Sequence, residues 1–143
     1  VKAEEGCVMR DSAEGRIQTV KGLGFNDGTV VLPFDTPSYN TKNAPAISFT
    51  LDIPEGAKYL EIRTLPSLHI YEGRDARYAV AIDRKAPEVF SIHAGDFSAE
   101  WRWNVLRGYA RRTVDLSSVS SGRHDVTISF LDPGIVLQEL RIY

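Results

Sequence analysis

The fold of this chain is constrained above all by a series of short runs in which apolar and polar residues alternate. The clearest run is Ala46–Ile53, with the sequence AISFTLDI. Its apolar positions are Ile47, Phe49, Leu51 and Ile53. Because successive side chains on a β-strand point to opposite faces, this alternation predicts a strand with one buried face. Pro54, Glu55 and Gly56 follow and predict a tight turn, since proline fixes φ and glycine accepts unusual backbone angles.

Similar segments follow one another along the chain, each bounded by turn residues such as Gly, Pro, Asn and Asp. They are Gly28–Pro33, Tyr59–Thr64, Tyr78–Asp83, Glu88–Ile92, Arg112–Leu116, Val126–Leu131, Ile135–Tyr143 and, with a less regular pattern, Lys2–Met9. Only Phe97–Leu106 has helical character, with Ser98 as N-cap and room for one or two turns. Strands that follow strands without long helices predict an all-β, antiparallel two-sheet sandwich of the jelly-roll type.

Length and charge bound the possible classes of protein. The chain has 143 residues, enough for one domain with a hydrophobic core, and begins with Val1 rather than Met. We therefore expect one domain, residues 1–143, excised from a larger protein. The formal net charge of −2 provides no basic face for nucleic acid. No apolar run approaches the roughly 20 residues that span a bilayer, so no membrane partner is expected.

Catalytic and metal-binding motifs are absent from the sequence. It holds no nucleophile elbow, zinc-protease motif, phosphate-binding loop or dinucleotide-binding loop. Cys7 is the only cysteine, and its spacing to the three histidines does not match a metal site. Carboxylates are plentiful, but sequence spacing cannot show the fixed separation that a glycosidase pair requires. An enzyme is therefore the less favoured class, and no catalytic residue is assigned.

Binding is better supported, by two groups of aromatic and basic residues. The first group is Trp101, Arg102, Trp103, Asn104 and Arg107, and the second is Tyr71, Arg74 and Arg77. Aromatic faces pack against the apolar face of a sugar ring, and Arg or Asn donates directional hydrogen bonds to hydroxyl or carboxylate groups. In a strand or loop, both tryptophans would lie on one side. The alternative is that the tryptophans form core and that Arg77 and Arg107 pin loops.

Several blocks of sequence resemble one family. In order, they are Arg63–Pro66 (RTLP), Arg77–Asp83 (RYAVAID), Trp101–Arg107 (WRWNVLR), Gly122–His124 (GRH) and Asp132–Gln138 (DPGIVLQ). Together they resemble the C-terminal β-sandwich domain of glycoside hydrolase family 115, a galactose-binding-like jelly roll similar to carbohydrate-binding modules. Family members are α-glucuronidases that remove (4-O-methyl)glucuronic acid from xylan.

The resemblance implies an accessory role. The catalytic residues of the family belong to other domains, so none is carried over to this chain. The implied partners are the catalytic domains of a parent enzyme, glucuronoxylan or a related glycan, and a second copy in a homodimer. The implied location is extracytoplasmic: periplasmic, cell-surface or secreted. The leading hypothesis is an accessory domain for packing and glycan contact; the alternatives are a protein–protein scaffolding module and a free-standing hydrolase.

Related modules also raise the question of a structural calcium ion. Some hold calcium with glutamates of the first strand and an aspartate of the last strand. The comparable positions here are Lys2, Glu4 and Gln138. We therefore expect no cofactor or metal, with Glu4 as the one candidate calcium ligand.

Overall fold

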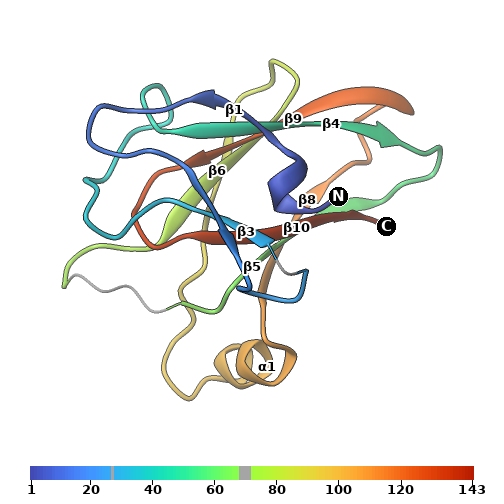
Figure 1. Ribbon diagram of the computed structural model, residues 1–143. Coiled ribbons are helices and arrows are strands. Elements are labelled where there is room, and N and C mark those ends of the chain that lie inside the picture. The colour runs from blue at the N-terminus through green and yellow to red at the C-terminus, as the bar shows by residue number, and fades with distance from the viewer. Residues whose placement is uncertain (27, 68–71) are drawn as a thin grey trace.

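The chain folds into two antiparallel sheets packed face to face. The computed structural model describes residues 1–26, 28–67 and 72–143, and within these each sheet has five strands (Figure 1). The first sheet has the order β1 (Cys7–Arg10), β4 (Ala46–Ile53), β9 (Gly122–Phe130), β6 (Arg77–Ile82) and β7 (Glu88–Ser91). The second has the order β2 (Gln18–Lys21), β3 (Gly28–Val31), β10 (Val136–Ile142), β5 (Tyr59–Thr64) and β8 (Ala110–Asp115). This confirms the predicted antiparallel sandwich.

Two short helices complete the secondary structure of the described residues. They are a 3₁₀ turn η1 (Ala3–Glu5) and an α-helix α1 (Ala99–Arg107). The N-cap prediction is confirmed, because the Ser98 side chain accepts a hydrogen bond from the Trp101 N–H at 3.1 Å. The helix is nine residues long, slightly longer than predicted. In the described part of the chain, no helix is both long and apolar enough to cross a membrane.

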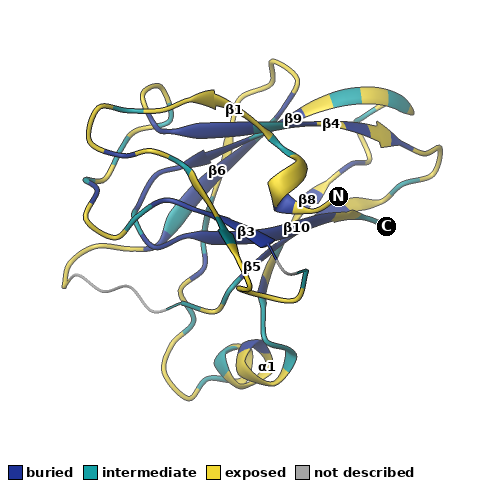
Figure 2. Cartoon of the chain, viewed as in Figure 1, coloured by how far each residue is buried: buried dark blue, intermediate teal, exposed yellow. Residues whose placement is uncertain are grey.

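The core lies between the sheets and follows the alternating pattern of the sequence. In β4, the inward side chains of Ile47, Phe49, Leu51 and Ile53 are buried, and so are those of Leu60 and Ile62 in β5. Figure 2 shows this burial as dark blue segments along the facing strands. Each fully buried side chain of this size contributes about 1.5–3 kcal/mol. The sandwich is therefore held together by the stripes that predicted its strands.

Two N-terminal elements differ from the sequence prediction. The expected strand Lys2–Met9 divides into η1 and the shorter strand β1, which pairs with β4. Strand β2 was not predicted, because its residues are largely exposed and show no apolar alternation. Only its pairing with β3 makes it a strand.

The outer face of the second sheet carries buried charges. Glu61 and Arg63 alternate along β5 with the core residues Leu60 and Ile62, and both are nevertheless buried, together with Glu139 of β10. Arg63 bonds Glu61 at 2.5 Å through Nε and Glu139 at 2.7 Å through Nη1. The Tyr109 ring lies over the guanidinium carbon at 4.2 Å. These partners replace the water that the three charges lose.

Gln138 of β10 is fully buried on the same strand as Glu139. Its Oε1 accepts a hydrogen bond from the Phe25 N–H at 3.1 Å. Asn26 donates to Glu139 at 3.1 Å. The connection between β2 and β3 is therefore attached to the outer face of the second sheet.

Candidate functional site

Helix α1 stands apart from the sandwich. It lies in the connection between β7 and β8, below the second sheet in the view of Figure 1. Of its nine residues, all of them described, only Asn104 is buried. Gly108, with a positive φ of 72°, ends the helix, and its N–H bonds the Val105 carbonyl. The helix thus presents most of its side chains to the surroundings.

The two tryptophans of α1 face different ways. In a helix, residues two apart lie about 200° apart around the axis. The expectation that both rings share one side, which assumed a strand or loop, is therefore wrong. Trp101 is half-buried and packs against Phe97 with ring centroids 5.3 Å apart, whereas Trp103 is 58% exposed.

A surface hollow of about 570 Å³ lies between α1 and β8. We call it the α1–β8 hollow. Its lining residues are Glu100, Trp103, Asn104, Arg107, Arg111 and Arg112. It therefore brings together three of the predicted binding residues, which are Trp103, Asn104 and Arg107. The arginines of β8 were missed, although an adjacent basic pair directly after the helix was visible in the sequence.

Local hydrogen bonds position the cationic groups of the α1–β8 hollow. Arg107 donates from Nη2 to Asn104 Oδ1 at 2.9 Å and from Nε to the Trp103 carbonyl at 3.1 Å. Arg112 bonds Glu100 at 2.5 Å and the Ser91 carbonyl at 2.8 Å. Three guanidinium groups and one carboxylate line the hollow, so it is electropositive.

The remaining predicted residues lie elsewhere. Arg102 is exposed and donates to the Phe97 carbonyl at 3.1 and 3.2 Å. Arg74 lines a separate hollow of about 450 Å³ with Glu14, Asp35, Thr36 and Pro37. Tyr71 lies outside the described residues. The predicted cluster therefore does not form one site.

Arg77 makes the contacts expected of a loop pin. Its Nε donates to Asp132 Oδ2 at 2.7 Å and its Nη2 to Oδ1 at 3.2 Å. The Arg77 backbone N–H also donates to Asp132, which is fully buried. The hydrogen bond with Asp132 raises the pKa of Arg77 further above its usual range. Arg77 thereby fastens the start of β6 to the turn before β10.

The carboxylates of the α1–β8 hollow do not form a glycosidase pair. Such a pair requires two opposed acids, about 5–10 Å apart across the substrate. Among the residues lining this hollow, Glu100 is the only acid, and it is bound to Arg112. The second acid of such a pair is therefore absent from the lining of this hollow.

The residues at the candidate calcium position do not fit that ion. Calcium takes six to eight oxygen ligands, as a rule including several carboxylates. The described residues contain no group of three or more His, Cys, Asp or Glu side chains that could hold a metal. Glu4 packs its carboxylate against Gly28, whereas Gln138 accepts from the backbone and Lys2 carries a positive charge.

The fold belongs to the class of β-sandwiches that also occurs in carbohydrate-binding modules. It is similar to that of a family 35 carbohydrate-binding module from Clostridium thermocellum, at a TM-score of 0.60 and 10% identity, covering 99% of this chain and 96% of that one. The exo-β-1,3-galactanase from Phanerochaete chrysosporium contains a similar fold, with a TM-score of 0.63 and 12% identity over 99% of this chain and 28% of that chain. Both likenesses concern the fold alone.

The family follows from the sequence as a whole. The model of the glycosyl hydrolase family 115 C-terminal domain matches residues 1–143, so the chain belongs to this family. A family GH115 4-O-methyl-α-glucuronidase with specificity for decorated arabinogalactans is 26% identical, with a TM-score of 0.76 over 99% of this chain. This chain spans 17% of that enzyme's chain. No curated protein matches the sequence.

Proposed function

We propose that this domain is a non-catalytic accessory domain of a glycoside hydrolase and that it contacts an acidic glycan through the α1–β8 hollow. The observation that carries the proposal is the exposed Trp103 ring beside the guanidinium groups of Arg107 and Arg111. The family supports the accessory role, and the residues of the hollow support the chemistry of the ligand.

The side chains match the two parts of a uronic acid residue. The face of Trp103 offers an apolar surface for the C–H groups of a sugar ring. Guanidinium groups bind a carboxylate with two parallel hydrogen bonds. Arg112 is neutralised by Glu100, whereas Arg111 lies 3.6 Å from Glu61 with its side chain 54% exposed. Arg107 and Arg111 are therefore the groups best placed to meet the carboxylate.

The substrate class and location of the parent enzyme belong to the same proposal. The related enzyme of known structure is a 4-O-methyl-α-glucuronidase, so glycans that carry glucuronic acid, such as glucuronoxylan or decorated arabinogalactan, are the ligands to examine first. We place the catalytic residues in other domains of the polypeptide. Because such polysaccharides lie outside cells, we expect an extracytoplasmic location.

Calorimetric titration tests this function. We expect a xylo-oligosaccharide bearing glucuronic acid to bind and the unsubstituted xylo-oligosaccharide to bind more weakly. Trp103→Ala removes the stacking surface and should weaken binding roughly tenfold, which is about 1.4 kcal/mol. Arg84→Ala, which removes an exposed charge in the β6–β7 turn, is the matched control and should bind as the wild type does. No heat from any acidic oligosaccharide at millimolar concentration would refute glycan contact.

A second candidate function is packing against protein without sugar binding. It is favoured by the exposed apolar side chains of Leu106 in α1 and of Phe97 just before the helix. The two functions use neighbouring side chains of α1, because Trp103 and Leu106 lie three residues apart, so a separate variant at each position is needed to distinguish them. A Leu106→Arg variant should keep glycan binding, and the Trp103→Ala variant should show the weakening given above.

A further inference from the structure

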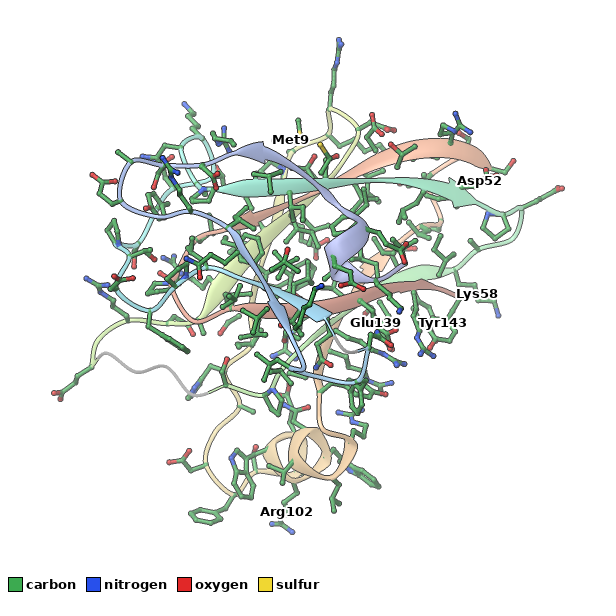
Figure 3. The ribbon with its side chains drawn as sticks, in the orientation of Figure 1. Met9, Asp52, Lys58, Arg102, Glu139 and Tyr143 are labelled. Atoms are coloured by element: carbon green, nitrogen blue, oxygen red, sulfur yellow. The ribbon has the colours of Figure 1, made fainter. Side chains whose placement is uncertain are left out.

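The side of α1 that faces away from the sandwich is apolar. Phe97 is 74% exposed, Leu106 is 77% exposed and Val105 is 54% exposed. Arg102 belongs to the same side, and Figure 3 shows it pointing away from the sandwich. We call these four residues the outer face of α1, although Phe97 belongs to the segment just before the helix.

The distribution of apolar and polar residues around α1 differs from that of an ordinary surface helix. Such a helix buries an apolar stripe and exposes polar residues. At 100° per residue, Arg102, Val105 and Leu106 span about 100° of the circumference, and the buried Asn104 lies on the opposite side. The helix thus turns Asn104 and the half-buried Trp101 toward its own domain, and Val105 and Leu106 outward.

Packing within the domain gives α1 little stability. Isolated helices shorter than about 12–15 residues are marginal in water, and α1 has nine residues. The Ser98 cap and the Gly108 terminus satisfy its ends, but Asn104 is its only buried residue. Burial of the apolar area that these side chains now expose would add hydrophobic stabilisation. A surface placed on the outer face would therefore stabilise both the helix and the contact.

We infer that the outer face of α1 docks against another domain of the same polypeptide. This inference rests on the accessory role proposed above and is independent of glycan binding. The chain corresponds to 17% of the related enzyme's chain, so a family member of that size has ample surface to cover the helix. Arg102 is the only charged side chain of the outer face. The complementary surface is therefore apolar with a carboxylate near its rim.

The size of the face argues for a partner in the same chain rather than a second copy. One aromatic and two aliphatic side chains bury roughly 500 Å² at most. A stable complex of separate chains buries about 600–1,000 Å² on each partner. A covalently linked partner is present at a high effective concentration, so a small contact suffices within one polypeptide.

Hydrogen–deuterium exchange of the amides of residues 99–107 tests the inference. The exchange rates are compared between the 143-residue chain and the full polypeptide that carries this domain. We expect exchange in α1 to be at least about tenfold slower in the full polypeptide, in keeping with about 1.4 kcal/mol of added protection. Leu106→Arg in the full polypeptide should restore the fast exchange. Val89→Arg, an equally drastic change at an exposed position of β7, is the control and should not.

The other outcomes each decide a separate point. If α1 exchanges equally fast in both proteins while other surfaces of the domain become protected, the docking surface is wrong but the accessory role stands. If no surface becomes protected, both are wrong. If the 143-residue chain associates with itself, and Leu106→Arg abolishes that association, the occupant is a second copy and the inference is overturned.

Discussion

The buried charges on the second sheet are the residues whose environment departs most from the sequence pattern. Arg63 is joined to Glu61 and Glu139, and it also donates to the Tyr143 hydroxyl at 3.1 Å. Burial alone would raise the pKa of Glu139, but hydrogen bonds from Asn26 and Arg141 outweigh it and lower that pKa. The alternation of β5 predicted only that these residues lie on the non-core face. Their burial depends on residues distant in sequence, such as Asn26 and Tyr109, and was not visible in the sequence.

Replacing Arg63 should destabilise the domain strongly. Arg63→Met leaves two buried carboxylates without their shared cation, which costs about 3–5 kcal/mol in comparable buried pairs. Chemical denaturation measures the loss in the free energy of unfolding. The control is Arg141→Met, because Arg141 also binds Glu139 but its side chain is 49% exposed, and exposed pairs contribute at most about 1 kcal/mol. Equal losses in both variants would contradict the buried network.

Asp83 and His124 form a pair that responds to pH. His124 Nδ1 lies 2.8 Å from Asp83 Oδ2. The hydrogen bond with Asp83 raises the pKa of His124, and the hydrogen bond with His124 lowers the pKa of Asp83. The raised histidine stabilises the fold below its ordinary pKa of about 6.5, and this contribution is lost as the pH rises through the raised value. The lowered aspartate stabilises above its ordinary pKa, and this is lost as the pH falls.

An NMR titration of the His124 ring checks this pair. The wild-type ring should titrate above its ordinary pKa, and Asp83→Asn should lower that pKa. Asparagine suits the position because Asp83 has a φ of 54°, a left-handed conformation that Asn accepts well. A His124 pKa that is unchanged by Asp83→Asn would show that the pair does not form.

At the scale of elements, the sequence predicted the strands that have an alternating pattern of their own. It missed the strand that forms only by pairing with a neighbour. The strands β4, β5 and β6 were predicted because their alternating residues face the core. Strand β2 was missed because its structure comes from pairing with β3. The helix was located by its Ser98 cap, but the pattern could not show that its apolar side faces outward. The two tryptophan side chains, Trp101 and Trp103, point in different directions because they lie on this helix, and the sequence analysis missed that as well.

Removal of the N-cap should loosen α1 alone. Ser98→Ala leaves the Trp101 N–H without its partner and should cost about 1 kcal/mol of helix stability. Amide exchange in residues 99–107 should become roughly fivefold faster, while the core strands exchange as before. Ser118→Ala, at an exposed position in the β8–β9 turn, is the control. Global unfolding by Ser98→Ala would contradict the view that α1 is peripheral to the sandwich.

At the scale of the whole molecule, the sandwich presents a helix and a hollow at one end. Its architecture was predictable because each alternating strand independently requires a facing apolar layer. The candidate site was only partly predictable. The site is lined by Trp103 of the helix and by Arg111 and Arg112 of an edge strand, and only the tertiary structure brings these residues together. The family accounts for the accessory role but does not identify the contacting surface.

An NMR titration of the ¹⁵N-labelled 143-residue chain with a xylo-oligosaccharide that bears glucuronic acid tests the central claim most directly, because it reports the binding surface and any cleavage together. We predict shifts centred on the Trp103 indole N–H and on the Arg107 and Arg111 side chains, with the sugar signals unchanged over time. Hydrolysis of the sugar by this chain, shifts confined to another part of the sandwich, or no shifts at millimolar ligand would contradict the account.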